Sequence, residues 1–492
     1  MLFNSYTFII FFAIVLILSR TIGNWAIKKF VLLCLSYLFY AAWNPPFVVL
    51  LWISTLIDWY AAQKLYESQK IHQRRFYLFI SLFVNLGMLS YFKYSNFLTE
   101  NLNTLLSTFG LSFSINTFDV ILPVGISFYT FQTMSYTIDI YRGNMRPGNS
   151  LLDYALYVTF FPQLVAGPIV RAADFLPQCE TPRIATKDQI GWGLCLFVIG
   201  LFSKVVIADA LMSPIAERVF DSQTSAGFLA AWTGTFAFTT QIFCDFFGYS
   251  TCAIGIALCL GFALPDNFRF PYAAIGFSDF WRRWHMSLSS WLKDYLYIPL
   301  GGNRKGNLRT YINLSITMLL GGLWHGASWM FVVWGGLHGF YLIAERLLLQ
   351  TRLAHFTIWQ TPFGRVILTL STFLLVCITW VFFRAPDIQR AFSLCTDMLN
   401  GNQAFDFFLT ILHPSQSLDL ANSILPGRFD YIVVAGCTGA LLGIHALLKE
   451  SSLEAFFAKL PSSFRIITLA TMVYLVILSM TGEDRAFIYF QF

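Results

Sequence analysis

Long uninterrupted apolar runs constrain this chain more than any other feature. Residues 6–18, 30–43, 76–92 and 366–383 form such runs. A transmembrane helix uses about 20 mostly apolar residues, whereas a strand of a membrane barrel has about 10 residues that alternate between apolar and polar. The runs therefore favour helices that cross a membrane and argue against a barrel.

The composition supports the same conclusion. Only 12% of the 492 residues are charged, against roughly 25% in an ordinary soluble domain, so a water-facing surface lacks polar cover. At about 20 residues for each span, the chain has room for about eleven or twelve transmembrane helices. The sequence shows no repeat of fixed period and no linker, so we expect one all-α polytopic membrane domain over residues 1–492.

Basic residues indicate which loops lie on which side. Arg20, Lys28 and Lys29 follow the first apolar run, and residues 63–75 carry four basic residues against one acid. The positive-inside rule places these loops in the cytoplasm, and it also accounts for the net charge of +6 without a nucleic-acid partner. The uncharged turn at residues 44–46 then lies outside, so we expect the N-terminus and the C-terminal tail on the outer side.

The middle of the chain is less regular. Residues 160–170 contain two prolines and a glycine, and Asp245 and Gly248 interrupt the long apolar run 228–263. Broken helices at membrane depth need cover from protein or an aqueous cavity. This pattern predicts re-entrant segments around a central cavity. The basic stretch 282–309 is expected at the cytoplasmic face.

Three histidines lie in unusual surroundings: His285 in FWRRWHMS, His325 in GGLWHG and His338 in GGLHG. An ionisable group inside a span is a functional candidate, because burying it is costly without a partner or a cavity. His325 fits this description best, and the glycines beside it leave room for a substrate. The alternative is a histidine bonded to a neighbouring helix, with the glycines serving close packing.

The segment around His285 has two interpretations. Its tryptophans and arginines are typical of an amphipathic helix at the membrane surface, anchored by Trp281, Trp284 and Trp291. The same cluster, with Arg282 and Arg283, suits the phosphates and adenine of a cytosolic nucleotide donor. Residue chemistry alone leaves both open.

Four carboxylates within or near apolar runs are candidates for a proton relay: Asp58, Asp139, Asp209 and Asp245. Pairing with Lys93, Lys204 or a backbone donor is the favoured alternative for most of them. The sequence contains no phosphate loop, dinucleotide fingerprint, serine-hydrolase elbow or zinc-protease motif. Its nine cysteines lack metal-ligand spacing. We therefore expect no bound cofactor and no metal site.

The last six residues, 487–492, contain four aromatic side chains. Polar and disordered residues are more usual at a free terminus. Either this tail anchors the chain, or it delivers Tyr489, its one hydroxyl group, into the cavity.

Five segments of the chain resemble segments of a known protein family. They are residues 121–143, 160–171, 279–304 (DFWRRWHMSLSSWLKDYLYIPLGGNR), 319–339 (LLGGLWHGASWMFVVWGGLHG) and the aromatic tail. In these segments the chain resembles the membrane-bound O-acyltransferase superfamily, in the bacterial branch of the alginate O-acetyltransferase membrane subunits (AlgI-type). Residues 241–255 depart from the family pattern at Phe247 and Thr251, which puts a direct catalytic role of Asp245 in doubt.

The resemblance implies a ring of helices around a funnel or tunnel, with His325 as the catalytic histidine and His285 as the second histidine of the same site. It implies transfer of an acetyl group from a cytosolic thioester such as acetyl-CoA to an extracytoplasmic polysaccharide such as alginate, across the bacterial inner membrane and with a periplasmic acetyltransferase as partner. Peptidoglycan and teichoic acid are alternative acceptors. The tail residue Tyr489 is then a candidate acyl carrier, and Arg282, Arg283 and Lys293 are candidates for phosphate contacts.

Two alternatives come from other classes of protein. In a proton-coupled transporter, the histidines and aspartates form a proton path, although the chain lacks the paired repeats common in that class. In a structural subunit of a polymer export complex, His325 has no chemical role.

Overall fold

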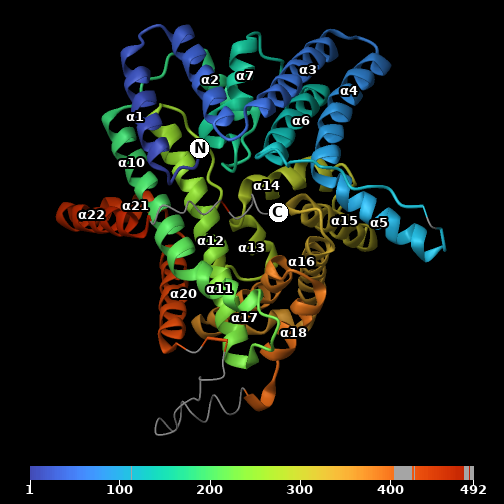
Figure 1. The fold of residues 1–492 in the computed structure, drawn as a ribbon, viewed down its shortest axis with the longest axis vertical. Coiled ribbons are helices and arrows are strands. Elements are labelled where there is room, and N and C mark those ends of the chain that lie inside the picture. Colours follow the sequence, from blue (N-terminus) through green and yellow to red (C-terminus); the bar gives the residue numbers. More distant parts are fainter. Residues whose placement is uncertain (112, 404–423, 426, 481–486, 488–492) are drawn as a thin grey trace. The chain divides into compact units, whose positions relative to one another are not determined.

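A computed structural model describes residues 1–111, 113–403, 424–425, 427–480 and 487. All regular structure in these residues is helical (Figure 1). The chain divides into two compact units, one made of Met1–Val198 with Tyr249–Asp266 and the other of Ile199–Gly248 with the described part of Asn267–Ile488. Each unit is therefore assembled from separate stretches of sequence. The expectation of one domain stays a prediction.

Seven helical segments are long and apolar enough to cross a membrane by length and composition: Pro45–Glu67, Ile71–Thr108, Lys187–Phe220, Gly227–Cys259, Pro362–Arg384, Arg428–Leu448 and Ser462–Ser479. This confirms the all-α polytopic fold class. The expected number of eleven or twelve spans is larger, and part of the difference lies in short helices. Helices α1, α2 and α6 have only 16, 17 and 17 residues.

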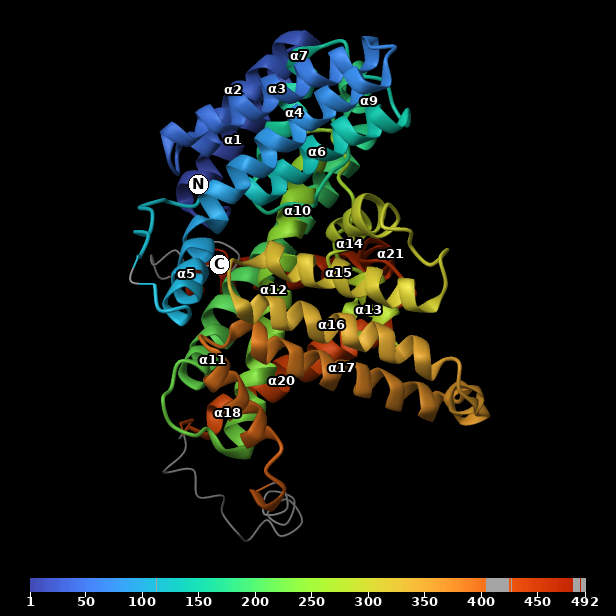
Figure 2. The same ribbon diagram turned by 90° about the vertical axis from the view of Figure 1, so that its right-hand side faces the viewer.

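The first unit is a bundle of helices, of which α2, α3, α4, α6 and α7 contact one another in sequence-distant pairs (Figure 2). Its helices are α1 (Tyr6–Thr21), α2 (Trp25–Ala41), α3 (Val48–Glu67), α4 (Ile71–Leu89), α5 (Ser95–Thr108), α6 (Ile126–Arg142), α7 (Leu151–Thr159), α8 (Phe161–Leu164), α9 (Ala172–Glu180) and most of α10 (Lys187–Leu201).

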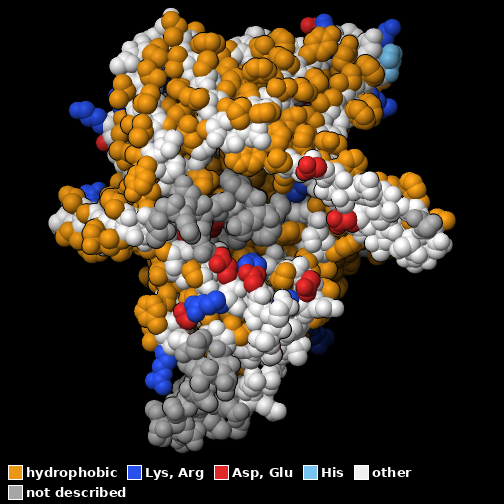
Figure 3. Space-filling view, viewed as in Figure 1, with side chains coloured by type: hydrophobic (Ala, Val, Ile, Leu, Met, Phe, Trp, Pro, Cys, Tyr) orange, Lys and Arg blue, Asp and Glu red, His pale blue; other side chains and the backbone are white. Residues whose placement is uncertain are grey.

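Hydrophobic side chains cover much of the surface of this unit, as expected where lipid is the solvent (Figure 3). On α1, Phe8 and Val15 are fully buried, whereas Ile10 and Ile17 are more than 60% exposed. Both faces of the helix are apolar, so one face packs in the protein and the other suits lipid.

The second unit carries the three histidine motifs. Its helices are η3 (Phe202–Met212), α11 (Ser213–Phe220), most of α12 (Gly227–Cys259), α13 (Phe277–Arg283), α14 (Met286–Leu292), α15 (Asn307–His325), α16 (Trp329–Leu348), α17 (Pro362–Arg384), α18 (Ile388–Met398), α20 (Arg428–Leu448), α21 (Leu453–Lys459) and α22 (Ser462–Ser479). Helices α15, α16 and α17 lie side by side in chain order (Figure 2).

Two helices end shortly before prolines. Helix α2 ends at Ala41, and the turn Pro45–Phe47 precedes α3. Helix α7 ends at Thr159, before the four-residue helix α8. Proline lacks the backbone N–H that would bond to the preceding turn of a helix, so it disfavours a continuous helix at these points. Both predicted breaks are confirmed.

The predicted break near Asp245 and Gly248 is wrong, because α12 runs without interruption through all 33 of its residues. Asp245 is accommodated in the helix by an ion pair with Lys204 (Nζ to Oδ1 2.5 Å). A Cβ atom on Gly248 would lie 2.7 Å from the carbonyl oxygen of Gly200. The glycine therefore allows a close helix crossing rather than a chain break.

Candidate active site

Helices α15 and α16 pack against each other as a hairpin that carries His325. A side chain on Gly322 would collide with the carbonyl oxygen of Phe331, and one on Gly335 would collide with that of Met318. The two helices thus cross with their backbones in close contact. This crossing fixes the last turn of α15, where His325 is only 3% exposed.

Aromatic rings surround His325. The imidazole lies 4.9 Å from the ring of Trp334, 5.1 Å from that of Trp324 and 5.5 Å from that of Phe383, all in edge-to-face geometry. These rings come from α15, α16 and α17. The imidazole is therefore held on several sides by apolar groups that limit the access of water.

His285 lies near His325, with 6.4 Å between the ring centroids. A proton-transfer group acts over about 3 Å, so this separation is short enough for both rings to act on one bound group. His285 is fully buried and joins α13 to α14 with φ 43° and ψ 54°. A left-handed conformation at a residue other than glycine is strained and is often found at functional sites.

Asn267 holds the second histidine, and sequence reasoning missed this residue. Its side-chain oxygen lies 3.0 Å from Nδ1 of His285 and accepts a hydrogen bond from the hydroxyl of Ser287 at 2.8 Å. Its backbone oxygen accepts from the N–H of Met286 at 2.9 Å. The amide oxygen faces a hydroxyl and a backbone N–H donor, so we assign the proton of the ring to Nδ1.

This arrangement fixes the chemistry of His285, which lies outside the candidate membrane spans. Burial lowers the pKa of His285 to about 3, because desolvation disfavours the imidazolium form. The ring is therefore neutral at ordinary pH, with Nε2 as its basic nitrogen. Phe246 packs edge-on against the ring, with a centroid distance of 4.6 Å.

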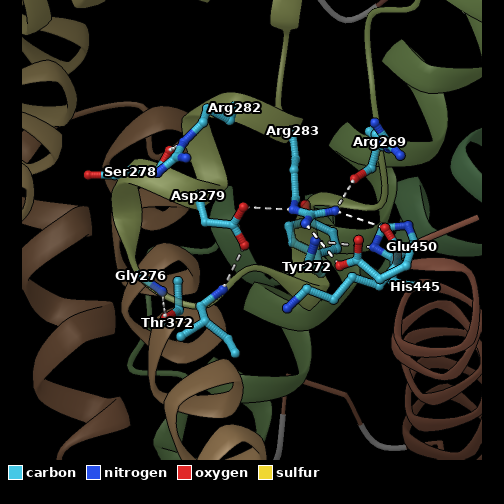
Figure 4. A network of polar contacts seen from close by, with 12 residues as sticks. Arg269, Tyr272, Gly276, Ser278, Asp279, Arg282, Arg283, Thr372, His445 and Glu450 are labelled. Carbon is cyan, nitrogen blue, oxygen red and sulfur yellow. Dashed lines mark hydrogen bonds and ion pairs between the residues drawn. The ribbon is translucent and has the colours of Figure 1, made fainter. Parts of the chain in front are cut away.

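The basic residues near His285 differ in their surroundings (Figure 4). Arg283 binds Asp279 at 2.9 Å, the backbone oxygens of Lys449 and Arg269 at 3.1 and 3.4 Å, and Glu450 at 3.6 Å. Its guanidinium thus ties α13 to the end of α20.

Arg282 and Lys293 are exposed. Within the described residues, the hydrogen bond of Arg282 goes to the backbone oxygen of Ser278. These two cations are more accessible to a charged ligand than Arg283.

Two tryptophans expected as surface anchors are part of the protein interior. Trp284 is fully buried and Trp291 is 6% exposed. Trp284 packs against Phe280, Phe268 and Trp380. The interpretation as an amphipathic surface helix is therefore wrong for these two residues.

Glu345 of α16 fixes the start of α13. Its carboxylate accepts hydrogen bonds from the backbone N–H groups of Phe277 and Ser278, both at 2.9 Å. Gly276 precedes them with φ 82°, and a Cβ atom there would lie 2.6 Å from Glu345. The helix that leads to His285 is therefore anchored on the helix that follows His325.

His338 and two of the candidate carboxylates are held by neighbours. His338 is fully buried, with Nε2 3.0 Å from the hydroxyl of Thr379. Lys204 binds Asp209 at 2.8 Å as well as Asp245, which confirms the predicted pairing with Lys204.

Within the aromatic tail, the structure describes Phe487. This residue is fully buried and its ring lies 5.5 Å from that of Phe246. Phe246 in turn contacts His285. Tyr489, the candidate acyl carrier, lies outside the described residues.

Comparisons with known proteins define the class to which this membrane protein belongs. The profile of the family described as "MBOAT, membrane-bound O-acyltransferase family" matches residues 43–383. That range includes His285, His325 and the helices that hold them. The chain belongs to the membrane-bound O-acyltransferase family and is an O-acyltransferase.

Similar proteins carry three names. A probable alginate O-acetylase AlgI of Pseudomonas putida is 39% identical over 456 residues, which cover 92% of this chain and 89% of that protein. A peptidoglycan O-acetyltransferase of Helicobacter pylori is 38% identical over 82% of this chain and 80% of its own length. A teichoic acid D-alanyltransferase of Bacillus subtilis is 24% identical over 54% of this chain and 70% of its own length. An acyltransferase class argues against the transporter and purely structural alternatives.

Proposed function

We propose that the chain takes an acetyl group from a cytosolic thioester such as acetyl-CoA and passes it across the bacterial inner membrane, for O-acetylation of an extracytoplasmic polysaccharide. The observation that carries this proposal is the pair of buried histidines 6.4 Å apart, within the segment that matches the family. The thioester donor cannot cross the bilayer because its nucleotide is charged. A tunnel through the protein would let the acyl group cross without the rest of the donor.

In the proposed reaction, His325 is the general base. It takes the proton of an attacking hydroxyl group, whose oxygen forms a bond to the thioester carbonyl carbon. The carbon–sulfur bond breaks, the thiolate leaves with the electron pair, and the proton taken up by His325 passes to the sulfur, which gives the free thiol and restores the base. His285 orients the donor or shares the proton transfer through Nε2, and Trp324 and Trp334 limit the access of water.

The proposed donor contacts are electrostatic. Arg282 and Lys293 are exposed, and in this proposal they contact the phosphates of the donor on the cytoplasmic side. Arg283 contributes to the electrostatic field of this region, while its hydrogen bonds go to Asp279 and to the backbone oxygens of Lys449 and Arg269, and it pairs with Glu450. No resident cofactor takes part in this scheme, in which the thioester is a substrate.

The first acceptor in this proposal is Tyr489. The contacts from Phe487 to Phe246 and from Phe246 to His285 place the first residue of the tail close to the second histidine. A phenol has a pKa of about 10 and so needs a base such as His325. Its acyl ester is then a donor for a periplasmic acetyltransferase, the proposed partner.

Replacing Tyr489 with Phe tests this relay. The variant keeps the ring and removes the hydroxyl, so we expect no labelled protein after incubation with radiolabelled acetyl-CoA and no acetylated polymer in cells. Tyr474→Phe is the matched control, because Tyr474 is an exposed residue of α22. Labelling of Tyr489→Phe at the wild-type level would leave the tail as an anchor only.

The proposed function also includes the polymer that accepts the acetyl group. Alginate is named for the relative at 39% identity and peptidoglycan for the relative at 38%, so we propose alginate and keep peptidoglycan as the alternative. Deleting the gene and measuring the acetyl content of both polymers separates them. Loss from alginate alone supports the proposal, whereas loss from peptidoglycan alone establishes the alternative.

A pH profile tests the role of Asn267. In Asn267→Asp, a carboxylate beside His285 stabilises the imidazolium form and raises the pKa of His285 above its present value of about 3. A protonated Nε2 cannot act as a base. As the pH is lowered, the variant should therefore lose transfer activity at a higher pH than wild type does. The measurement is the transfer rate against pH.

Ser287→Ala is the control for that experiment. It removes one hydrogen bond to Asn267 and leaves the bond between Asn267 and the ring. Losing one positioning hydrogen bond of about 1 kcal/mol corresponds to a factor of about five in rate, without a shift of the pH profile. Matching profiles for Asn267→Asp and wild type would show that Asn267 does not act on the ring.

A further inference from the structure

A fully buried carboxylate lies in the middle of a candidate membrane span. Asp58 is 0% exposed in the 20-residue helix α3. At 1.5 Å per residue it is about 15 Å from either end of that helix, near the centre of a bilayer core. No ion pair joins Asp58 to a basic residue in the part of the chain that the structure describes. An ionised carboxylate in this position needs a compensating positive charge.

The hydrogen bonds of Asp58 are all on one of its oxygens. Asn85 of α4 donates to Oδ2 at 2.7 Å, and Ser54 donates weakly to the same atom at 3.4 Å. The second amide proton of Asn85 goes to the backbone oxygen of Ser81. The amide oxygen of Asn85 accepts from Ser54 and from Thr133 of α6. Asn85 therefore has no donor left for the other oxygen, Oδ1.

The helices around Asp58 carry further buried oxygens. Oδ1 itself, the hydroxyls of Thr55 and Ser81 and the phenol of Tyr154 are buried and make no hydrogen bond in the described structure. The Ser81 hydroxyl lies close enough to the carboxyl group of Asp58 to interact with it. Tyr154 and Tyr136 lie close enough to respond to the charge of Asp58. These groups come from α3, α4, α6 and α7.

One carboxylate among hydroxyl oxygens matches the ligands that hard cations prefer. A single positive charge neutralises the single carboxylate, which selects a monovalent cation over a divalent one. We propose that Asp58 Oδ1, with the hydroxyls of Ser81, Thr55 and Tyr154, binds an alkali-metal cation that holds α3, α4 and α7 together. This site is independent of the histidine pair and of the proposed function.

Thermal unfolding of the full-length protein in detergent tests the site, with NaCl exchanged for choline chloride at constant ionic strength. A ligand bound only by the folded state raises its stability with concentration. We expect the unfolding midpoint of wild type to rise with sodium to a plateau, by more than about 2 °C. Asp58→Asn should unfold at the same temperature in both salts, because its neutral amide needs no cation.

The control is Glu67→Gln, which changes an exposed carboxylate on the same helix and should keep the sodium response. Ser81→Ala keeps the charge and removes one oxygen, so we expect the sodium concentration for half the effect to rise several-fold. This variant serves if Asp58→Asn does not fold. Equal midpoints of wild type in the two salts, or an unchanged response in Ser81→Ala, would overturn the proposal and indicate that Asp58 carries a proton.

Discussion

His325→Ala should abolish O-acetylation of the polymer while the amount of the protein in the membrane is unchanged. A general base contributes about 10²- to 10⁴-fold to a rate, and a loss of this size reduces acetylation below ordinary detection. The protein should stay folded, because the aromatic rings around His325 also pack against one another: Trp334 contacts Phe383 and Trp380.

The matched control is His355→Ala, which removes an exposed histidine between α16 and α17. Both variants lose one imidazole, but only the first loses the buried one. Polymer acetylation and membrane protein level are measured in the same cells. Normal acetylation in His325→Ala would exclude His325 as the base, and a low protein level would show that its role is in folding.

Gly335→Ala should have the second large effect, this time on folding. The added Cβ atom would collide with the backbone oxygen of Met318, and backbone atoms cannot move aside as a flexible side chain does. Overpacking of this kind costs about 1–3 kcal/mol or more. We expect a lower unfolding temperature, less protein in the membrane and loss of transfer, because the same crossing positions His325.

The adjacent glycine provides the control. In Gly336→Ala the added atom would lie 3.5 Å from a side-chain carbon of Leu319, an ordinary contact. Alanine is also favoured over glycine inside a helix by about 1 kcal/mol, so this variant should be as stable as wild type. Equal stability of the two alanine variants would contradict the proposed close crossing.

The sequence predicted the features that depend on neighbouring residues. Unbroken apolar runs predicted the apolar helices at residues 76–92 and 366–383, and Pro45 and Pro162 marked the helix breaks. Hydropathy and backbone restrictions act over a few residues, so they can be read from one sequence.

Features that depend on distant residues were not predictable in this way. The run 228–263 was expected to break at Asp245, but Lys204 lies on another helix and neutralises that charge. Asn267 precedes His285 by 18 residues, and no spacing rule connects an amide in a loop to that ring. Trp284 lies in a segment whose tryptophans and arginines are typical of a surface anchor, yet the helices around it bury it completely.

The surroundings of Asp58 also could not be predicted from the sequence. Its position in an apolar run was evident, and pairing with Lys93, Lys204 or a backbone donor was the favoured expectation for most of the four carboxylates. The tertiary structure instead brings Asn85, Ser81 and Thr133 to the carboxyl group. Neutral polar groups of this kind carry no charge pattern that a sequence could reveal.

The most direct test of the central claim is release of free thiol from radiolabelled acetyl-CoA by the purified full-length protein in lipid vesicles. Wild type and His355→Ala should release thiol and retain the labelled acetyl group on the protein, whereas His325→Ala should do neither. Equal thiol release by His325→Ala and wild type would contradict the assignment of the buried histidine pair as the acyl-transfer site.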